Sequence, residues 1–292
     1  MTDDMREPAE SAAEDAVPIE EYFDWNDAWK ARQLRRRHAD DVEFWNGRAP
    51  SFAKTAGTSP YAREFLQRAG IEAGQTVFDM GCGSGTLALP LAQQGIEVWA
   101  CDFSPKMIEL MMKRAELEGT AGLIHPISLS WAEDWSVREL PTCDVAFASR
   151  SVATSDLRSA LEKLDGQARE RVCMTLGTDL SPRCDEVLLR AAGRPPEPYT
   201  DYVYGMNILW QMGRQPSLSY IRSQRSGTFA SPEEALEQTC RAMEATAAER
   251  ERLEAYTREH IVRDVDKHGE PCWRYDHTRV TSWAFISWDT RS

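Results

Sequence analysis

Val77-Phe78-Asp79-Met80-Gly81-Cys82-Gly83-Ser84-Gly85-Thr86 is the stretch that decides the fold, because a short apolar run leads directly into three glycines at alternate positions. A glycine-rich turn between a strand and a helix lets a ligand approach the backbone where Cβ atoms would otherwise block it. The spacing is G-x-G-x-G, whereas the dinucleotide pattern G-x-G-x-x-G would need a glycine at Thr86. Asp79 would repel a pyrophosphate, but it suits a ligand that carries an ammonium and a sulfonium group.

A second acidic residue follows at the end of the next predicted strand, Glu97-Val98-Trp99-Ala100-Cys101-Asp102. A carboxylate about twenty residues after such a turn can accept hydrogen bonds from both hydroxyls of a ribose. Ser104 and Pro105 then provide an N-cap and a first helical residue. The two motifs together predict a nucleoside-containing ligand that is not a dinucleotide.

Strands and helices alternate outward from this stretch. Helices are expected over 61–69, 86–94, 105–118 and 157–164, and strands over 123–129, 144–149 and 171–176. This alternation predicts an α/β fold, a Rossmann-like doubly wound sheet of mostly parallel strands with helices on both faces. Strands are also expected over 218–224 and 281–288. Between them, Ser231 caps one helix and a charged helix runs from about Ala247 to Arg263.

The glycine motif and the acidic loop resemble those of the class I S-adenosylmethionine-dependent methyltransferases, over about Ala53 to Leu176. The resemblance implies S-adenosyl-L-methionine as the cofactor. It also implies seven strands with the last, Thr281 to Trp288, antiparallel to the rest. The helices between about 231 and 263 would then be an insertion before that strand.

The resemblance also implies which residues contact the cofactor. The glycine loop would pass the methionine part, Asp102 would bind the ribose, and Phe103 and Met107 would pack on the adenine. Trp131 departs from the family, which usually has an acid at that place. The complete implied set is Tyr61, Asp79, Gly81, Cys82, Gly83, Gly85, Asp102, Phe103, Met107, Trp131, Ala132, Glu133 and Ser149.

The sequence gives fewer signals for the residues that bind the methyl acceptor. Transfer from a sulfonium is an in-line displacement, so positioning can suffice, and a base is needed only if the nucleophile carries a proton. No catalytic residue is assigned. Arg150 either binds an anionic substrate or pairs with Asp144 or Asp156. Aromatic residues outside the sheet either form a lid that contacts substrate, with Trp45 as the candidate, or cover the sheet edges as core. They are Trp25, Trp29, Trp45, Phe52, Tyr199, Tyr202, Tyr204 and Trp210.

Three segments are expected along the chain. Residues 1–18 read as a disordered acidic tail, residues 19–52 as an N-terminal helical lid, and residues 53–292 as the methyltransferase domain. The lid segment is too short to hold a core of its own, since domains below about 40 residues usually need disulfides, metals or partners.

Composition narrows the function. The 292 residues carry a formal net charge of −13, which disfavours nucleic acid as a partner and favours a small-molecule substrate. The alternatives are methylation of RNA or protein, and a non-catalytic S-adenosylmethionine-binding protein. No apolar run is long enough for a membrane span and no signal peptide is evident, so a cytoplasmic protein is expected. The sequence leaves open whether the protein forms a homodimer.

The cysteines and histidines indicate no metal. The seven cysteines lack a C-x-x-C pair and are expected to be buried, reduced thiols. Zinc is the alternative at His260, His268, Cys272 and His277, but their spacing matches no standard ligand template.

Overall fold

The computed structural model describes residues 23–34, 42–43, 45–46, 59–152, 154–178, 185–196, 200–225, 227–266 and 268–291. The predicted tail, residues 1–18, lies outside these ranges, as do Phe52, Tyr199 and Cys184. Of the predicted lid, the described parts are helix α2 (Trp25–Gln33) with its flanking residues and the pieces 42–43 and 45–46.

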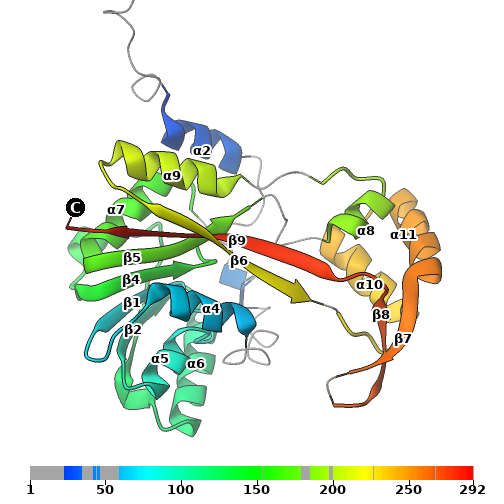
Figure 1. Ribbon diagram of the computed structural model, residues 1–292, viewed down its shortest axis with the longest axis horizontal. Helices are drawn as coiled ribbons and strands as arrows, with labels where there is room; N and C mark the ends of the chain where they lie inside the picture. The colour runs from blue at the N-terminus through cyan, green and yellow to red at the C-terminus, as the bar shows by residue number, and fades with distance from the viewer. Residues whose placement is uncertain are drawn as a thin grey trace, which may run out of the picture.

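A seven-stranded sheet forms the centre of the fold (Figure 1). Its strands are β1 (Thr76–Met80), β2 (Glu97–Asp102), β3 (Ile124–Ser128), β4 (Cys143–Ser149), β5 (Ala168–Gly177), β6 (Ser217–Arg225) and β9 (Arg279–Asp289). They are ordered β3-β2-β1-β4-β5-β9-β6, and among these described strands β9 alone runs in the direction opposite to the other six. The predicted Rossmann-like sheet with an antiparallel last strand is confirmed. The strand order reverses between β1 and β4, which is where such sheets bind ligands.

Helices cover both faces of this sheet. One face carries α4 (Pro60–Ala69), α5 (Ala88–Gln93) and α6 (Pro105–Leu117), and the other carries α7 (Leu157–Gln167) and α9 (Asp201–Gln211). Side chains of β4 alternate between the two cores, with Val145 and Phe147 in the first and Ala146 and Ala148 in the second. Strands buried on both faces explain the nearly continuous apolar runs in the sequence. Short 3₁₀ turns, Ala121–Leu123 and Trp135–Val137, precede β3 and β4.

Two predicted N-caps begin their helices as expected. The Ser104 hydroxyl accepts a hydrogen bond from the Met107 amide at 3.3 Å, and the Ser231 hydroxyl accepts one from the Glu234 amide at 3.2 Å. A proline follows each cap and supplies a φ already suited to the first helical turn. The start of α6 is therefore fixed, and with it the position of the acidic loop that precedes the helix.

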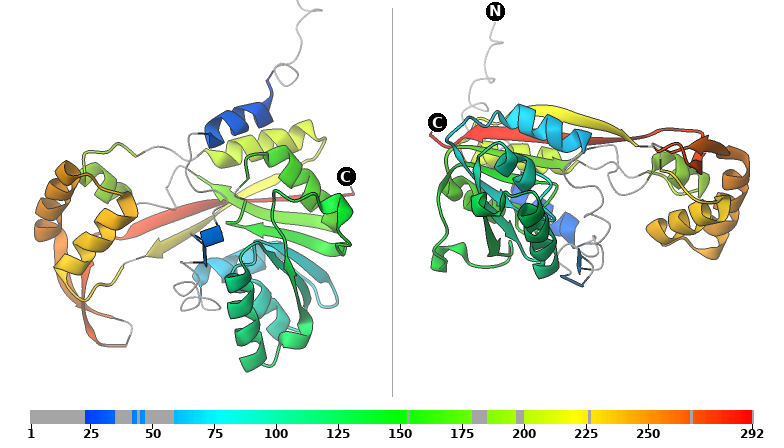
Figure 2. Two further views of the ribbon diagram at one scale, coloured as in Figure 1. Left: turned by 180° about the vertical axis from the view of Figure 1, so that it is seen from behind. Right: turned by 90° about the horizontal axis from the view of Figure 1, so that it is seen from below.

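A second, smaller lobe is inserted between β6 and β9 and stands apart from the sheet (Figure 2). It contains α10 (Pro232–Met243), α11 (Ala247–His260), β7 (Ile261–Val265) and β8 (Pro271–Tyr275), and α8 (Glu186–Ala191) packs on it. The lobe has a core of its own, formed by Leu188, Leu189, Ala192, Ala235, Leu236, Cys240, Met243, Leu253 and Tyr275. The insertion lies where it was predicted, but the charged helix ends at His260. Ile261–Val265 instead pairs with Pro271–Tyr275 as a hairpin.

Within the described ranges, no helix is both long and apolar enough to cross a bilayer. The six described cysteines are buried free thiols. The histidines near the C-terminal strand form ordinary polar contacts, His260 with Asp276 and His277 with Asp185, each at 3.0 Å. Among the residues that the structure describes, no group of three or more His, Cys, Asp or Glu side chains could hold a metal.

Candidate functional site

The glycine loop leaves β1 in a backbone conformation that suits glycine. Gly81 has a φ of 77°, and a Cβ there would lie 2.2 Å from the Cβ of Ser151. Gly85 has a φ of 84°, and its Cβ would lie 2.8 Å from side-chain atoms of Leu89 and Met111. Both positions combine a left-handed backbone with close packing, so neither tolerates a side chain. The loop therefore lies directly against the segment that follows β4.

Asp79 is a buried carboxylate beside this loop. Its side chain is 1% exposed, and its Oδ2 accepts no hydrogen bond from the described residues. Burial, and then the nearby carboxylate of Asp102, raises the pKa of Asp79 to about 7. A buried carboxylate oxygen without a partner is costly, and an ammonium ligand would offset that cost. The site therefore fits the cationic α-amino group of the predicted cofactor.

Asp102 is held in one orientation at the end of β2. Its Oδ2 accepts a hydrogen bond from the Gly83 amide at 2.9 Å, and its Oδ1 accepts one from the Ser104 amide at 2.8 Å. Burial raises its pKa, and these backbone hydrogen bonds act against the rise. Each carboxylate oxygen can accept a further hydrogen bond. The arrangement suits a ribose with two adjacent hydroxyl groups.

The residues predicted around the adenine lie at the same edge of the sheet. Met107 is buried and Phe103 is half-buried on α6 and the loop before it. Trp131 is buried, and its indole Nε1 donates to the Ser151 carbonyl at 2.8 Å, while Ala132 is exposed. Glu133 accepts from the Ser130 amide at 2.8 Å and pairs with Arg138 at 2.5 Å. Both contacts of Glu133 are thus with residues of the same segment, between β3 and β4.

Lys163 of α7 was missed by the sequence analysis. Its ammonium donates to the carbonyls of Trp131 and Glu133 at 2.7 and 2.8 Å. Helix α7 therefore holds the loop that follows β3 in place. A lysine on a helix thirty residues away from this loop gives no local signal of that role. The contact is visible only once the chain is folded.

Tyr61 joins the ends of β4 and β5. Its hydroxyl hydrogen-bonds Ser149 Oγ at 2.9 Å and Thr175 Oγ1 at 2.8 Å, and burial raises its pKa. The guanidinium of Arg150 lies 4.0 Å from the centre of the Tyr61 ring. Thr175 was not predicted, since one threonine in an apolar strand has no distinctive pattern.

The two carboxylates that the sequence offers as partners of Arg150 bind other groups. Asp144 pairs with Arg169 at 3.1 Å and accepts a hydrogen bond from the Thr76 amide. Asp156 pairs with Lys30 at 3.1 Å. Arg150 itself is exposed, at the point where the chain leaves β4.

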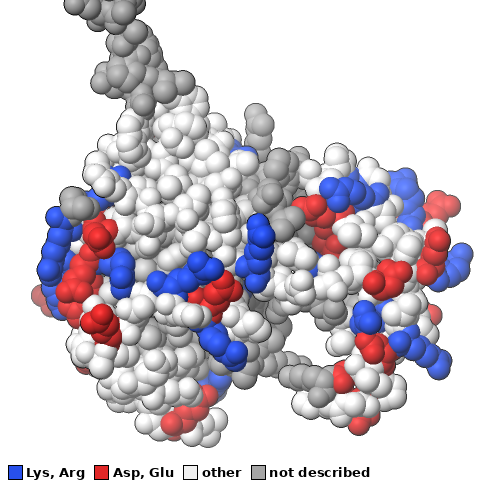
Figure 3. Space-filling view, viewed as in Figure 1, with Lys and Arg blue, Asp and Glu red and all other residues white. Residues whose placement is uncertain are grey.

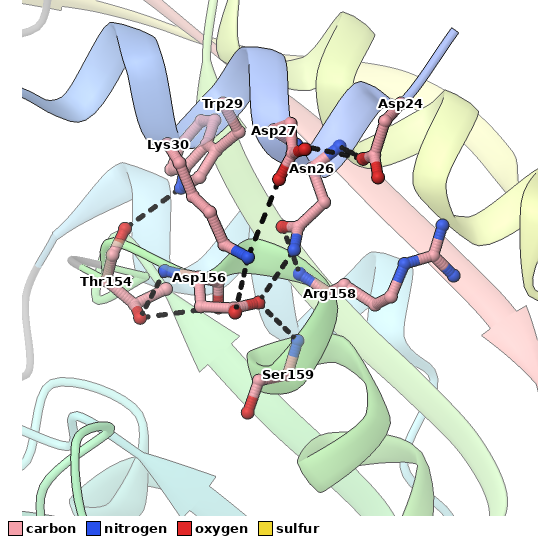
Figure 4. Close-up of polar contacts among 9 residues, drawn as sticks. All are labelled: Asp24, Asn26, Asp27, Trp29, Lys30, Thr154, Asp156, Arg158 and Ser159. Atoms are coloured by element: carbon pink, nitrogen blue, oxygen red, sulfur yellow. Dashed lines mark hydrogen bonds and ion pairs between the residues drawn. The ribbon is translucent and has the colours of Figure 1, made fainter. Parts of the chain in front are cut away.

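Helix α2 lies against the loop that follows β4 (Figure 4). The indole Nε1 of Trp29 donates to the Thr154 carbonyl at 2.9 Å, and the side-chain Nδ2 of Asn26 donates to Asp156 Oδ1 at 3.0 Å. At the other side of the site, the Ser104 hydroxyl donates to the Asn46 side chain at 2.6 Å. The described N-terminal pieces therefore contact both the loop after β4 and the acidic loop after β2.

The chain is similar in sequence or fold to several known proteins. The model of a family described as a methyltransferase domain matches residues 77–171. An uncharacterized protein from Haemophilus influenzae is 36% identical over 189 residues, which are 63% of this chain and 68% of that protein. A demethylmenaquinone methyltransferase from Paenarthrobacter aurescens is 29% identical over 108 residues, 37% of this chain and 40% of that protein. Among solved structures, magnesium protoporphyrin IX methyltransferase from Synechocystis with bound S-adenosylhomocysteine is 15% identical. Its TM-score is 0.41, over 91% of this chain and 97% of that one.

Proposed function

We propose that this chain, which belongs to the class I S-adenosylmethionine-dependent methyltransferases, methylates a small-molecule acceptor. The observation that carries the proposal is the contact of the N-terminal pieces with both sides of the site. Asn46 binds Ser104 at the acidic loop, and Trp29 binds Thr154 in the loop after β4. Segments placed in this way leave room for a small acceptor more readily than for a macromolecule.

The charge distribution also supports a small acceptor. The net charge of −13 repels polyanions. On the face that Figure 3 presents, basic and acidic side chains are interspersed, and they are frequent on the second lobe. A continuous basic stripe is the usual footprint of nucleic-acid binding. The mixed pattern favours acceptors other than RNA or DNA.

The cofactor contacts that we propose follow the geometry of the site. When bound, S-adenosylmethionine supplies a methyl group that its sulfonium already activates. Asp79 would bind the α-ammonium group and Asp102 the ribose hydroxyls. The backbone of Gly81, Cys82, Gly83 and Gly85 would lie along the methionine part, and Tyr61 and Ser149 would close that end. On the adenine side we propose Phe103, Met107, Trp131, Ala132 and Glu133.

The acceptor would approach from the side of the loop after β4. Ser151 packs against Gly81, so this loop lies beside the methionine end of the proposed cofactor site. The half-buried Trp45, one residue before Asn46, is the proposed apolar contact on the opposite side. The chain's contribution to the reaction is then alignment and exclusion of water.

Residues 19–52 would act as a lid over residues 53–292 and not as a separate unit. Trp29 supports this proposal because it is 1% exposed within the core of the main sheet. Hydrogen exchange of the full chain, with and without S-adenosylhomocysteine, tests it. Added ligand should slow exchange in α2 and in residues 154–159. Unchanged exchange in both segments, at saturating ligand, would show that the helix only packs.

The proposed function is tested with cell extract and methyl-labelled S-adenosylmethionine. A labelled product that passes an ultrafilter is expected. Label retained with RNA or protein would show a macromolecular methyltransferase. Binding of S-adenosylhomocysteine without any labelled product would indicate a non-catalytic cofactor-binding protein.

A further inference from the structure

We propose that Trp131 is a positioning residue for methyl transfer, which ties the loop after β3 to the loop after β4. Lys163 of α7 would support it by holding the loop after β3 in place. The inference rests on the proposed function, in which the acceptor approaches from the side of the loop after β4. Both residues would act through Ser151 and contact neither the acceptor nor the methyl group.

The first observation is that three loops meet at Ser151. Trp131 is 6% exposed, and its indole Nε1 donates to the Ser151 carbonyl at 2.8 Å. A buried indole N–H usually finds an acceptor, and here the acceptor belongs to another loop. The Ser151 hydroxyl donates to the Met80 carbonyl at 2.6 Å, and the Ser151 side chain packs on Gly81. The loops after β1, β3 and β4 are therefore joined at one residue.

The second observation is that Trp131 is itself held in one orientation. The Lys163 ammonium donates to the carbonyls of Trp131 and Glu133, and it lies 5.5 Å from the centre of the Trp135 ring. The Trp131 and Trp135 rings are stacked, with centres 5.4 Å apart and an angle of 19° between their planes. The backbone and the ring of Trp131 are thus both fixed, so its N–H points to a defined place.

The third observation is that the loop after β4 is also anchored at both of its ends. At its start, the Arg150 amide donates to Thr175 Oγ1 at 2.9 Å, and the Arg150 backbone has a φ of 57°. At its far end, the Thr154 carbonyl accepts a hydrogen bond from α2 at 2.9 Å (Figure 4). Ser151 lies between these anchors, next to the glycine loop. The bond from Trp131 therefore acts on the part of the loop that lies beside the methionine end of the cofactor site.

These contacts bear on the reaction because methyl transfer is an in-line displacement. The acceptor atom must lie opposite the leaving sulfur, and a misplacement of about 1 Å can cost about 100-fold in rate. In the proposed function, the glycine loop flanks the methionine part and the loop after β4 flanks the acceptor. Trp131 sets how these two loops lie against each other. Asp79 and Asp102 would bind the cofactor outside this chain of described contacts, so loss of the Trp131 bond should slow transfer more than it weakens cofactor binding.

Two other roles for Trp131 make different predictions. If its main contact is with the adenine, its loss raises the KM for S-adenosylmethionine and weakens S-adenosylhomocysteine binding. If it only packs in the core, its loss lowers the free energy of unfolding while the folded protein keeps its rate. A positioning role lowers the rate at saturating cofactor.

The experiment uses the full chain, methyl-labelled S-adenosylmethionine and a fixed amount of cell extract. Trp131→Phe keeps an aromatic ring but removes the N–H, and Lys163→Met keeps the length of the side chain but removes the ammonium. Trp135→Phe is the matched control, because the Trp135 Nε1 donates at 2.9 Å to the Ser130 carbonyl, within the same segment between β3 and β4. The labelling rate is measured against cofactor concentration, calorimetry gives the S-adenosylhomocysteine affinity, and urea titration gives the free energy of unfolding.

Trp131→Phe and Lys163→Met should each lower the labelling rate at saturating cofactor by about 10- to 100-fold. The KM for S-adenosylmethionine and the affinity for S-adenosylhomocysteine should stay close to wild type. The double variant should be no slower than the slower single variant, because both substitutions act through one contact. The Trp135→Phe control should keep its rate even where it loses stability.

A rise in the KM for S-adenosylmethionine that accounts for the whole loss of labelling overturns this inference alone. Folded variants with a wild-type rate, or a control that is slowed equally, overturn it as well. Label confined to macromolecules in the wild type overturns the small-molecule proposal alone, since the rates of the variants can still be compared on that product. A wild type without any labelled product overturns both.

Discussion

Replacing Asp79 with asparagine should stabilise the ligand-free protein while it weakens cofactor binding. The wild-type carboxylate is 1% exposed, and its pKa is raised to about 7. An unfolded aspartate titrates near 3.9, so the shift is roughly 3 units, at about 1.4 kcal/mol for each unit. Ionised Asp79 therefore costs the folded protein up to about 4 kcal/mol, and a neutral asparagine avoids that cost.

The pH dependence gives the prediction its sign. Between about pH 4 and pH 7 the folded protein keeps a proton on Asp79 that the unfolded chain has lost, so the free energy of unfolding falls as pH rises through this window. Above about pH 7 the carboxylate is charged in both states and the full cost is present. The gain from Asp79→Asn should therefore be about 4 kcal/mol at pH 8 and only about 1.5 kcal/mol at pH 5.

Urea unfolding of both proteins at the two pH values measures the gain, and calorimetry with S-adenosylhomocysteine at pH 8 measures the loss of binding. Asp144→Asn is the control. The pKa of Asp144 is lowered by hydrogen bonds from Thr76 and by Arg169, which act against its partial burial, so this variant should lose stability at pH 8. An Asp79→Asn protein that is less stable than wild type at pH 8, or equally shifted at both pH values, would refute the reasoning.

Three further predictions follow from the site and the core. Asp102→Ala should weaken S-adenosylhomocysteine binding by roughly 1–3 kcal/mol in calorimetry, and an unchanged affinity in a folded variant would mean that another acid binds the ribose. Gly81→Ala should abolish that binding, because its Cβ would lie 2.2 Å from the Cβ of Ser151 at a φ of 77°, and wild-type affinity would refute the close approach. Trp29→Ala should lower the free energy of unfolding by about 3–5 kcal/mol in urea titrations. Trp210→Ala, at a tryptophan that is 50% exposed, should change it little, and equal losses would contradict the placement of α2.

Much of the fold and the centre of the candidate site were predictable because their signals are local. The glycines, Asp79 and Asp102 lie within one strand–loop–helix–strand stretch, and Ser104 marks its helix by a capping pattern of adjacent residues. The antiparallel β9 was predicted from the family resemblance. None of these predictions required knowledge of which distant segments meet.

The contacts that were missed join residues far apart in the chain. Tyr61 and Thr175 are separated by 114 residues, and Asn26 and Asp156 by 130. Each is an ordinary polar residue until tertiary folding brings its partner near. Periodicity describes the face of one element and not the element opposite it, so such pairs leave no trace in the local sequence.

The prediction that the charged helix α11 extends to Arg263 was wrong for a different reason. Charged residues continue along the chain after α11 ends at His260, as they would if the helix continued. Ile261 and Val262 are β-branched, however, and pair with Tyr275 and Arg274 in the hairpin. Strand pairing with β8 thus overrides the charge pattern of the preceding turns.

The position of β9 has a consequence for synthesis of the protein. It lies between β5 and β6 although the ribosome makes it after both, and about fifty residues separate the end of β6 from its start. At ribosomal rates of about 5–20 residues per second, β6 waits roughly 3–11 s for β9, and β5, which ends about a hundred residues before β9, waits roughly 5–20 s. Until then both have unpaired edges, which are templates for joining other nascent chains. The second lobe is made in that interval and can close around its own core first. By folding early, the lobe draws the two ends of the long connection together, so that β9 enters the sheet across a short gap.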